Sequence, residues 1–375
     1  MQYRTFEKTG EKISLLGFGS MRLPEDSNGK VDEAEAIRMI RHAIDNGVNY
    51  VDTAYVYHGG TSEVVVGKAL RDGYREKVLL ADKLPIWSVG DESGLPRVFN
   101  EQLNRLGVQM IDMYLLHNLA APLWKLTKKF NILNFLEKIR GEGKIKHIGF
   151  SFHDDVSLFK EIIDAYDWDF CQIQLNYMDQ EWQAGIEGFN YAVAKGIPVI
   201  VMEPLKGGLL TDKFPDNVAK FWQEADTKRT PAEWAFRWVA NFPEVLTILS
   251  GMNTMWQVEE NLRILSDATA SSLTEKEAGI IKKVANTYNE LIQYPCTACG
   301  YCKPCPQKID IPTLMNVYNE WHLFAQSEKT KGLYQFFPEG RRASDCTGCK
   351  SCEERCPQGL NITEVMEKAA ELFEK

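Results

Sequence analysis

The stretch Ile111-Asp112-Met113-Tyr114-Leu115-Leu116-His117 is mostly apolar and ends in a histidine. Similar short apolar runs alternate with amphipathic helical patterns over the first three quarters of the chain, at steps of roughly 25 to 40 residues. In the helical pattern 32–45, apolar residues recur at helical spacing behind a capping Asp32. This rhythm is typical of βα units and predicts a parallel sheet.

Eight of these apolar runs are candidate strands. Eight βα units in about 265 residues have the size and count of a (β/α)8 barrel, which is an α/β fold. The predicted strands are Leu15–Gly19, Tyr50–Thr53, Val78–Lys83, Ile111–His117, Ile145–Ser151, Phe170–Leu175, Ile197–Met202 and Val245–Leu249.

Polar side chains stand where several of these strands end. They are Asp52, Lys83, His117 and Ser151, with Tyr57 just beyond the second strand and Gln172 on the sixth. Any one of them alone is as well explained by a cap or a turn. Barrel enzymes place their catalytic groups at the C-terminal ends of the strands, so the whole set predicts an active site there.

The composition limits the functional classes. The chain has 375 residues, of which 44% are hydrophobic and 25% charged, which suits one large core and a small appended domain. A formal net charge of −9 gives no basic surface for nucleic acid. No apolar stretch approaches the ~20 residues that span a bilayer, and the polar segment 1–14 does not resemble a signal peptide. We expect a cytoplasmic protein that acts on a small molecule, with no nucleic-acid or membrane partner.

Eight of the nine cysteines form two runs near the C-terminus, Cys296-x2-Cys299-x2-Cys302-x2-Cys305-Pro306 and Cys346-x2-Cys349-x2-Cys352-x3-Cys356-Pro357. Three cysteines at three-residue steps can surround one face of an iron-sulfur cube, and a fourth before proline characteristically ligates the other cluster of a pair. The spacing therefore predicts two [4Fe-4S] clusters. Their ligands are Cys296, Cys299, Cys302 and Cys356 for one cluster, and Cys305, Cys346, Cys349 and Cys352 for the other.

Zinc binding and disulfide bonds are the alternative uses of these cysteines. Four-cysteine zinc sites also contain C-x2-C pairs, but zinc does not need eight thiolates in this arrangement. Disulfides need an oxidising compartment, which nothing at the N-terminus indicates. The first run departs from the usual cluster pattern, with two residues instead of three before Cys305. Cys171 lies in the apolar run 170–175 and is expected to be a buried packing residue.

Several short motifs lie within residues 1–285. They are Leu16-Gly17-Phe18-Gly19-Ser20-Met21-Arg22, Asp52-Thr53-Ala54-Tyr55-Val56-Tyr57, Lys83, Leu115-Leu116-His117, Gly149-Phe150-Ser151 and Glu260-Asn261. By these motifs the sequence resembles the aldo-keto reductases. This resemblance implies a TIM barrel that binds NAD or NADP without a Rossmann fold and reduces an aldehyde or ketone to an alcohol, or the reverse. Residues 286–375 resemble the tail of a branch of the family with a C-terminal ferredoxin-type domain, small and mainly helical.

The resemblance implies a catalytic tetrad of Asp52, Tyr57, Lys83 and His117. Tyr57 is chosen over Tyr55 because the tyrosine of the family stands five residues after its aspartate. Hydride reduction needs a proton donor at the developing alkoxide, and a tyrosine with a pKa near ~10 needs help near neutrality. Lys83 would lower the pKa of Tyr57 and Asp52 would keep the lysine charged. His117 would hydrogen-bond the substrate oxygen.

Cofactor contacts also follow from the resemblance. Ser151 and Gln172 match positions that bind the nicotinamide carboxamide, whereas Met202 replaces the usual stacking aromatic ring. The loop 203–208 is expected to wrap the pyrophosphate. The full predicted set is Gly19, Ser20, Met21, Ser151, Gln172, Met202, Glu203, Pro204, Leu205, Gly207, Gly208, Gly251, Met252, Asn253, Gln257, Glu260 and Asn261.

The choice between NAD and NADP depends on the segment after the eighth strand. Gly251 and Gln257 stand where many members carry the lysine and arginine that grip the 2′-phosphate. A phosphate without a cationic partner is poorly held, so NAD is favoured unless Lys206 or Arg263 supplies the charge.

Hydride transfer moves two electrons, whereas each cluster changes by one, so three interpretations of the clusters remain open. In the first interpretation the clusters are structural or redox-sensing groups in a carbonyl reductase. In the second the clusters exchange electrons with a ferredoxin or another redox partner. The third interpretation is a non-catalytic redox-sensing module, which the complete tetrad disfavours. Trp87 and Trp124, in the loops after the third and fourth strands, either shape a substrate pocket or cover the barrel rim. The substrate itself cannot be read from the sequence.

Overall fold

The computed structural model describes residues 1–211, 215–296, 302–324, 328–356 and 358–375. The chain divides into two compact units. The first comprises Met1–Asn176, Gln183–Pro204 and Ala235–Leu273. The second comprises Tyr177–Trp182, Leu205–Trp234 and Thr274–Lys375. The division falls within helix α9 (Pro231–Ala240).

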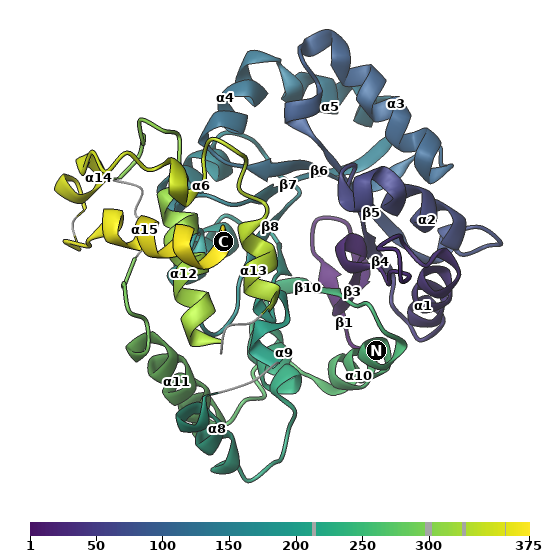
Figure 1. Ribbon diagram of the computed structural model, residues 1–375. Helices are drawn as coiled ribbons and strands as arrows, with labels where there is room; N and C mark the ends of the chain where they lie inside the picture. The colour runs from purple at the N-terminus through teal and green to yellow at the C-terminus, as the bar shows by residue number, and fades with distance from the viewer. Residues whose placement is uncertain (212–214, 297–301, 325–327, 357) are drawn as a thin grey trace. The chain divides into compact units, whose positions relative to one another are not determined.

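The first unit is a closed barrel of eight parallel strands, seen in Figure 1. The predicted barrel is therefore confirmed, and each strand begins and ends within two residues of its predicted bounds. The strands are β3 (Leu16–Gly19), β4 (Tyr50–Asp52), β5 (Leu79–Leu84), β6 (Ile111–Leu119), β7 (Ile145–Phe152), β8 (Phe170–Gln174), β9 (Val199–Met202) and β10 (Val245–Gly251).

An antiparallel hairpin of β1 (Tyr3–Phe6) and β2 (Glu11–Ser14) precedes the barrel, and the sequence analysis missed it. Phe6 and Ile13 are fully buried in the same core cluster as residues from the first halves of most barrel strands. The hairpin thus packs toward the N-terminal end of the barrel. This leaves the C-terminal strand ends for the predicted active site.

Helices follow the strands, as βα units require. The first of them, α1, shows why they form where they do. The Asp32 carboxylate accepts the backbone N–H of Glu35, which confirms the predicted cap, and the buried face of α1 includes Met39 and Ile40. These helices are α1 (Glu33–Asp45), α2 (Thr61–Ala69), α3 (Leu95–Leu106), α4 (Ala121–Lys129), α5 (Ile132–Gly141), α6 (Val156–Asp164), α7 (Gly185–Ala194) and α10 (Met255–Asp267).

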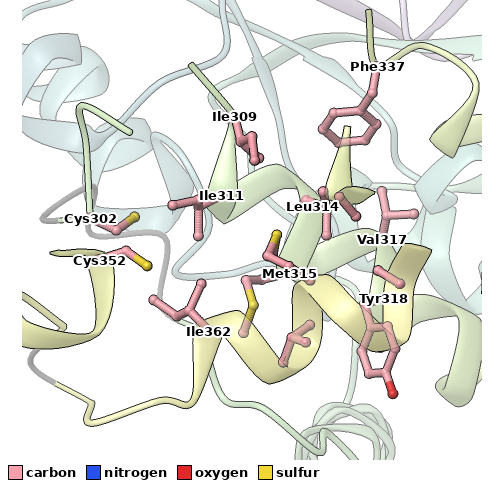
Figure 2. Packing of buried hydrophobic residues seen from close by; sticks show 14 of the residues in the cluster. Cys302, Ile309, Ile311, Leu314, Met315, Val317, Tyr318, Phe337, Cys352 and Ile362 are labelled. Carbon is pink, nitrogen blue, oxygen red and sulfur yellow. The ribbon is translucent and has the colours of Figure 1, made fainter. Parts of the chain in front are cut away.

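The second unit is helical where it is described. A capping box of Thr274 and Glu277 begins α11. Helices α12 and α15 share one apolar core, and Figure 2 shows Cys302 and Cys352 at the edge of this core, beside Ile311 and Ile362. The described helices of the second unit are α8 (Asp216–Gln223), α11 (Glu275–Glu290), α12 (Ile311–Leu323), α13 (Glu328–Tyr334), α14 (Ser351–Glu354) and α15 (Ile362–Phe373).

Among the described helices, none combines the length and the apolar character needed to cross a membrane.

Candidate active site and cysteine centre

Asp52 and Lys83 form a buried ion pair at the C-terminal ends of two neighbouring strands. Asp52 is the last residue of β4, and Lys83 lies near the end of β5. Lys83 Nζ donates to Asp52 Oδ1 at 2.6 Å and to the carbonyl oxygen of Thr53 at 2.7 Å. The two side chains are 4% and 1% exposed, so solvent does not screen this pair. These contacts keep the Lys83 ammonium charged and fix its orientation.

The remaining two predicted tetrad residues lie beside this lysine. Tyr57 begins the 3-10 helix η2 (Tyr57–Gly60), and the centroid of its ring is 5.0 Å from Lys83 Nζ. The rings of Tyr57 and His117 are 6.0 Å apart and nearly perpendicular. Tyr55 faces elsewhere, because its hydroxyl donates to Glu101 at 3.0 Å. The structure thus brings the four predicted residues together and separates Tyr57 from Tyr55.

The electrostatics of the tetrad follow from burial. Burial opposes the charge of Lys83, but Asp52 and Tyr57 outweigh this effect and the pKa of Lys83 is raised. Burial also raises the pKa of Tyr57. Lys83 acts on Tyr57 in the expected downward direction, but it does not outweigh burial. The phenol of Tyr57 therefore holds its proton at neutral pH.

His117 is neutral in this environment. Burial, followed by the charge of Lys83 and by His153, places the pKa of His117 well below its ordinary value. Its Nδ1 is buried and has no hydrogen-bond partner among the residues that the structure describes. A neutral imidazole has one N–H to donate, which suits a carbonyl oxygen placed between His117 and Tyr57.

The two tryptophans considered above have different environments. Trp87, in the 3-10 helix η4 (Ile86–Ser88), is 43% exposed, and its ring lies 5.2 Å from that of His117. Trp124 is 2% exposed and its indole N–H donates to Glu161 at 2.7 Å. Trp87 is therefore available to a substrate at the tetrad, whereas Trp124 is a packing residue of α4.

Ser151 and Gln172, the predicted nicotinamide contacts, lie on adjacent strands. They are register partners in β7 and β8, and Gln172 donates to the sulfur of Met202 in β9 at 3.4 Å. The buried Gln172 Oε1 has no partner in the described part of the chain. An unpartnered amide oxygen fits the NH2 group of a carboxamide, so these residues suit the cofactor. The Ser151 hydroxyl already accepts the backbone N–H of Asn118 at 2.8 Å.

Several other predicted cofactor residues have structural contacts of their own. The hydroxyl of Ser20 donates to the carbonyl of Asp52 at 2.8 Å, whereas Met21 is 47% exposed. Asn261 is buried and donates to Ser250 at 3.1 Å. The Gln257 amide oxygen accepts the backbone N–H of Asn253 at 2.8 Å.

The segment after β9 continues into the second unit. There the 3-10 helix η6 (Lys206–Thr211) contains Gly207 and Gly208 with φ of 64° and 90°, a region that favours glycine. Lys206 is buried between two carboxylates, with Nζ 2.8 Å from both oxygens of Asp179 and 2.7 Å from Glu320 Oε1. The positive charge of Lys206 is thus already compensated by two carboxylates, so Lys206 is a poor candidate for a 2′-phosphate ligand.

Thiols from both cysteine runs line one cavity in the second unit. Its lining includes all four predicted ligands of the second cluster, Cys305, Cys346, Cys349 and Cys352, together with Cys302. Arg355 also lines it and donates to the carbonyls of Lys303 and Pro304, joining the two runs. Cysteines are the residues that ligate iron-sulfur clusters, so the chemistry of this lining suits such a group. Among the described residues, no three His, Cys, Asp or Glu side chains are close enough to bind a single metal ion. Of the first predicted set, Cys299 lies outside the described residues.

Cys171, the cysteine outside the two runs, is fully buried in β8, as predicted.

Comparison with known proteins agrees with this geometry. Residues 15–286 match the Aldo/keto reductase family, and residues 295–361 match the 4Fe-4S dicluster domain. The chain is 30% identical over 311 residues to NADH-specific methylglyoxal reductase of Escherichia coli (strain K12), which spans 70% of this chain and 94% of that protein. It is 26% identical over 315 residues to L-galactose dehydrogenase of Arabidopsis thaliana, with 76% and 96% covered.

Solved structures share the barrel. The holo form of an aldo-keto reductase from Bacillus halodurans superposes with a TM-score of 0.63 at 26% identity, over 76% of this chain and 96% of that one. An aldo-keto reductase from Klebsiella pneumoniae in complex with NADPH shares the fold, with a TM-score of 0.61 at 23% identity and the same coverage. The family match extends over well more than half of the chain. The protein belongs to the aldo/keto reductase family and is an oxidoreductase of that family with a C-terminal 4Fe-4S dicluster domain.

Proposed function

We propose that the protein reduces an aldehyde or ketone to an alcohol with NAD(P)H, or catalyses the reverse, with Tyr57 as the proton donor. The observation that carries this proposal is the position of Lys83, bonded to the buried Asp52 and facing the ring of Tyr57. The names of the two relatives, NADH-specific methylglyoxal reductase and L-galactose dehydrogenase, are consistent with carbonyl and alcohol chemistry.

Each tetrad residue has a proposed task at the substrate oxygen. A bound NAD(P)H would supply hydride to the carbonyl carbon. As the C=O double bond becomes a single bond, the neutral His117 donates its N–H to the oxygen and Tyr57 transfers its phenolic proton there. Lys83 stabilises the phenolate that remains, and Asp52 keeps Lys83 charged. In the oxidative direction Tyr57 receives the proton from the alcohol.

The cofactor contacts remain proposals. Ser151 and Gln172 would hold the carboxamide, and Gln172 offers a buried oxygen for it. Two observations support NAD over NADP. Position 251 is a glycine where many members of the family have a lysine, and the charge of Lys206 is already paired with Asp179 and Glu320. The boundary between the barrel and the 4Fe-4S domain near residue 285, and a cytoplasmic location, also stay predictions.

Tyr57→Phe tests the proposed donor, with Tyr55→Phe as the matched control. Loss of the donor is expected to lower kcat for carbonyl reduction by about 10²- to 10⁴-fold. NADH binding, followed by quenching of protein fluorescence, is expected to stay within about twofold. Tyr55→Phe removes a hydroxyl that contacts Glu101 and is expected to keep nearly full activity. Retained turnover in Tyr57→Phe would refute the assignment.

The match to the 4Fe-4S dicluster domain supports a second candidate function, in which the clusters exchange electrons with the barrel or with a redox partner such as a ferredoxin. NADH added to anaerobic protein is then expected to bleach the cluster absorbance. Bleaching by dithionite alone would leave the clusters off the hydride path. Neither outcome affects the test of Tyr57.

A further inference from the structure

A second buried carboxyl lies directly behind Lys83. Successive side chains of a strand point to opposite faces, so Asp82 faces away from the barrel interior that receives Lys83. Asp82 and Glu63 are both fully buried, and they approach each other from β5 and α2. Two carboxyl groups in contact within a dry site cannot both carry a charge at modest cost.

Asp82 holds the backbone of the proposed catalytic lysine. Its Oδ1 accepts the backbone N–H of Lys83 at 2.8 Å. Its Oδ2 accepts the Gln102 amide at 2.8 Å, and the same amide nitrogen donates to the Lys83 carbonyl at 3.0 Å. The Tyr114 hydroxyl donates to Gln102 Oε1 at 2.6 Å and fixes the orientation of that amide. Asp82 and Gln102 together therefore bind both polar groups of the Lys83 backbone.

Glu63 is anchored from its other side. Its Oε2 accepts from Arg105 at 2.8 Å, and Arg105 is also bonded to Glu101. Glu63 Oε1 is buried and has no donor among the described residues unless one of the two carboxyls is protonated. Burial raises the pKa of Asp82 well above its ordinary value, and the neighbouring Glu63 raises it further. One proton between Glu63 and Asp82 satisfies both groups.

We propose that Asp82 is a positioning residue that holds Lys83 in place. Asp82 does so as a neutral acid whose proton is shared with Glu63. This proposal rests on the proposed role of Lys83. The groups that face Asp82 are Glu63 with its partner Arg105, the amide of Gln102, the hydroxyl of Tyr114 and Lys83 itself. With that proton in place the pair carries a single negative charge, on Glu63 beside Arg105, and Asp52 is the ionised carboxylate in direct contact with the Lys83 ammonium. Loss of the shared proton would add a second negative charge behind Lys83 and weaken the effect of Lys83 on Tyr57.

The test compares Asp82→Asn with Asp82→Ala. An amide at position 82 reproduces two contacts of the neutral acid, since its oxygen can accept from Lys83 N–H and its NH2 can donate to Glu63. The NH2 cannot accept from Gln102 as Oδ2 does, but Gln102 still donates to the Lys83 carbonyl. Asp82→Asn is therefore expected to keep kcat within about threefold of the wild type. Asp82→Ala is expected to lower kcat by about ten- to hundredfold, with the KM for NADH nearly unchanged. Equal losses in the two variants would overturn the proposal.

Asp112→Asn is the matched control. Asp112 Oδ2 also accepts a backbone N–H of β5, that of Leu80 at 2.9 Å, but Asp112 pairs with Arg75. Its loss is expected to lower the melting temperature without changing the pH profile of kcat. In contrast, Asp82→Asn is expected to remove any alkaline decline that comes from ionisation of the pair.

A spectroscopic readout separates this proposal from the proposed function. The infrared difference spectrum between wild type and Asp82→Asn at neutral pH is expected to contain the carbonyl stretch of a protonated carboxylic acid. The band depends only on the shared proton, so it is expected even if Tyr57→Phe shows that the reaction has been misassigned. Absence of the band would overturn the shared proton whatever the activity of the enzyme.

Discussion

At the scale of single residues, Lys83 is the centre of the proposed active site. Its ammonium is charged in a dry environment because Asp52 is bonded to it, and that charge acts on Tyr57 across 5.0 Å. The sequence motif was sufficient to predict these residues together. It was not sufficient to predict the raised pKa of Tyr57 or the neutral state of His117, because both come from burial by residues distant in the sequence.

The pH dependence of reduction follows from these directions. Reduction needs Tyr57 protonated, so activity is present below the pKa of Tyr57 and lost above it. Because this pKa is raised, kcat/KM is expected to stay flat up to at least about pH 10, the ordinary value for tyrosine. His117 gives no acidic decline above about pH 6.5, since its pKa is lowered. A decline centred between these limits that persists in Asp82→Asn would contradict the assignment of charges to Tyr57 and His117.

Replacement of the lysine sharpens this test. Lys83→Met removes the charge that favours the phenolate, so kcat is expected to fall by about 10²-fold or more and any alkaline decline to move to higher pH. Lys77→Met is the matched control, because Lys77 is exposed and lies 4.1 Å from the ring of Tyr74. The control is expected to change neither kcat nor the pH profile. A lower alkaline pKa in Lys83→Met would contradict the proposed effect on Tyr57.

At the scale of elements, α2 connects the tyrosine to the carboxyl pair. It follows η2, which begins at Tyr57, and it carries Glu63. Its packing on α3 depends on Gly67, because a Cβ there would lie 2.2 Å from the carbonyl oxygen of Leu106. Backbone has little room to move aside, so a side chain at this position must push the two helices apart.

Gly67→Ala is therefore expected to destabilise the barrel by about 1–3 kcal/mol, as overpacking usually does. The measurement is thermal unfolding followed by circular dichroism, together with the activity that remains. Gly141→Ala is the control, because Gly141 ends α5 and an added Cβ there would meet no atom within 4 Å. It is expected to be neutral or stabilising by up to about 1 kcal/mol. Equal melting temperatures for the two variants would show that α2 can shift without cost.

The elements also show what a sequence can reveal. Every barrel strand was predicted within two residues, because a strand buried on both faces is a continuous apolar run. The β1–β2 hairpin was missed because Phe6 and Ile13 stand alone among polar neighbours. Their burial comes from the barrel core that they join, so local periodicity carries no sign of it.

At the scale of the whole molecule, both cysteine runs contribute to one cavity. Cys302 and Cys305 of the first run line it together with Cys346, Cys349 and Cys352 of the second. The cavity is consistent with Cys305 as a ligand of the second cluster, and because it also includes Cys302, the exchange of a ligand between the runs stays a prediction. The NAD preference could not be judged as well from sequence, since only the fold shows that Lys206 is buried between carboxylates.

Cys305→Ser is expected to remove one cluster and leave the other. Iron in anaerobically purified protein is expected to fall from about eight to about four per chain, with sulfide falling in parallel. Cys171→Ala is the control, because this buried thiol lies in the barrel, and it is expected to keep all the iron. Unchanged iron in Cys305→Ser would contradict the assignment of Cys305 as a cluster ligand.

The buried contact of Lys206 with Asp179 and Glu320 has a consequence for truncation of the chain. Glu320 lies on α12, between the two cysteine runs, whereas Asp179 and Lys206 come from connections between barrel strands. Segments 177–182 and 205–234 belong to the same compact unit as the tail. A chain cut before the first cysteine run would leave the buried Lys206 ammonium with one of its two carboxylates, which is costly for a buried charge. The tail is therefore not a detachable module.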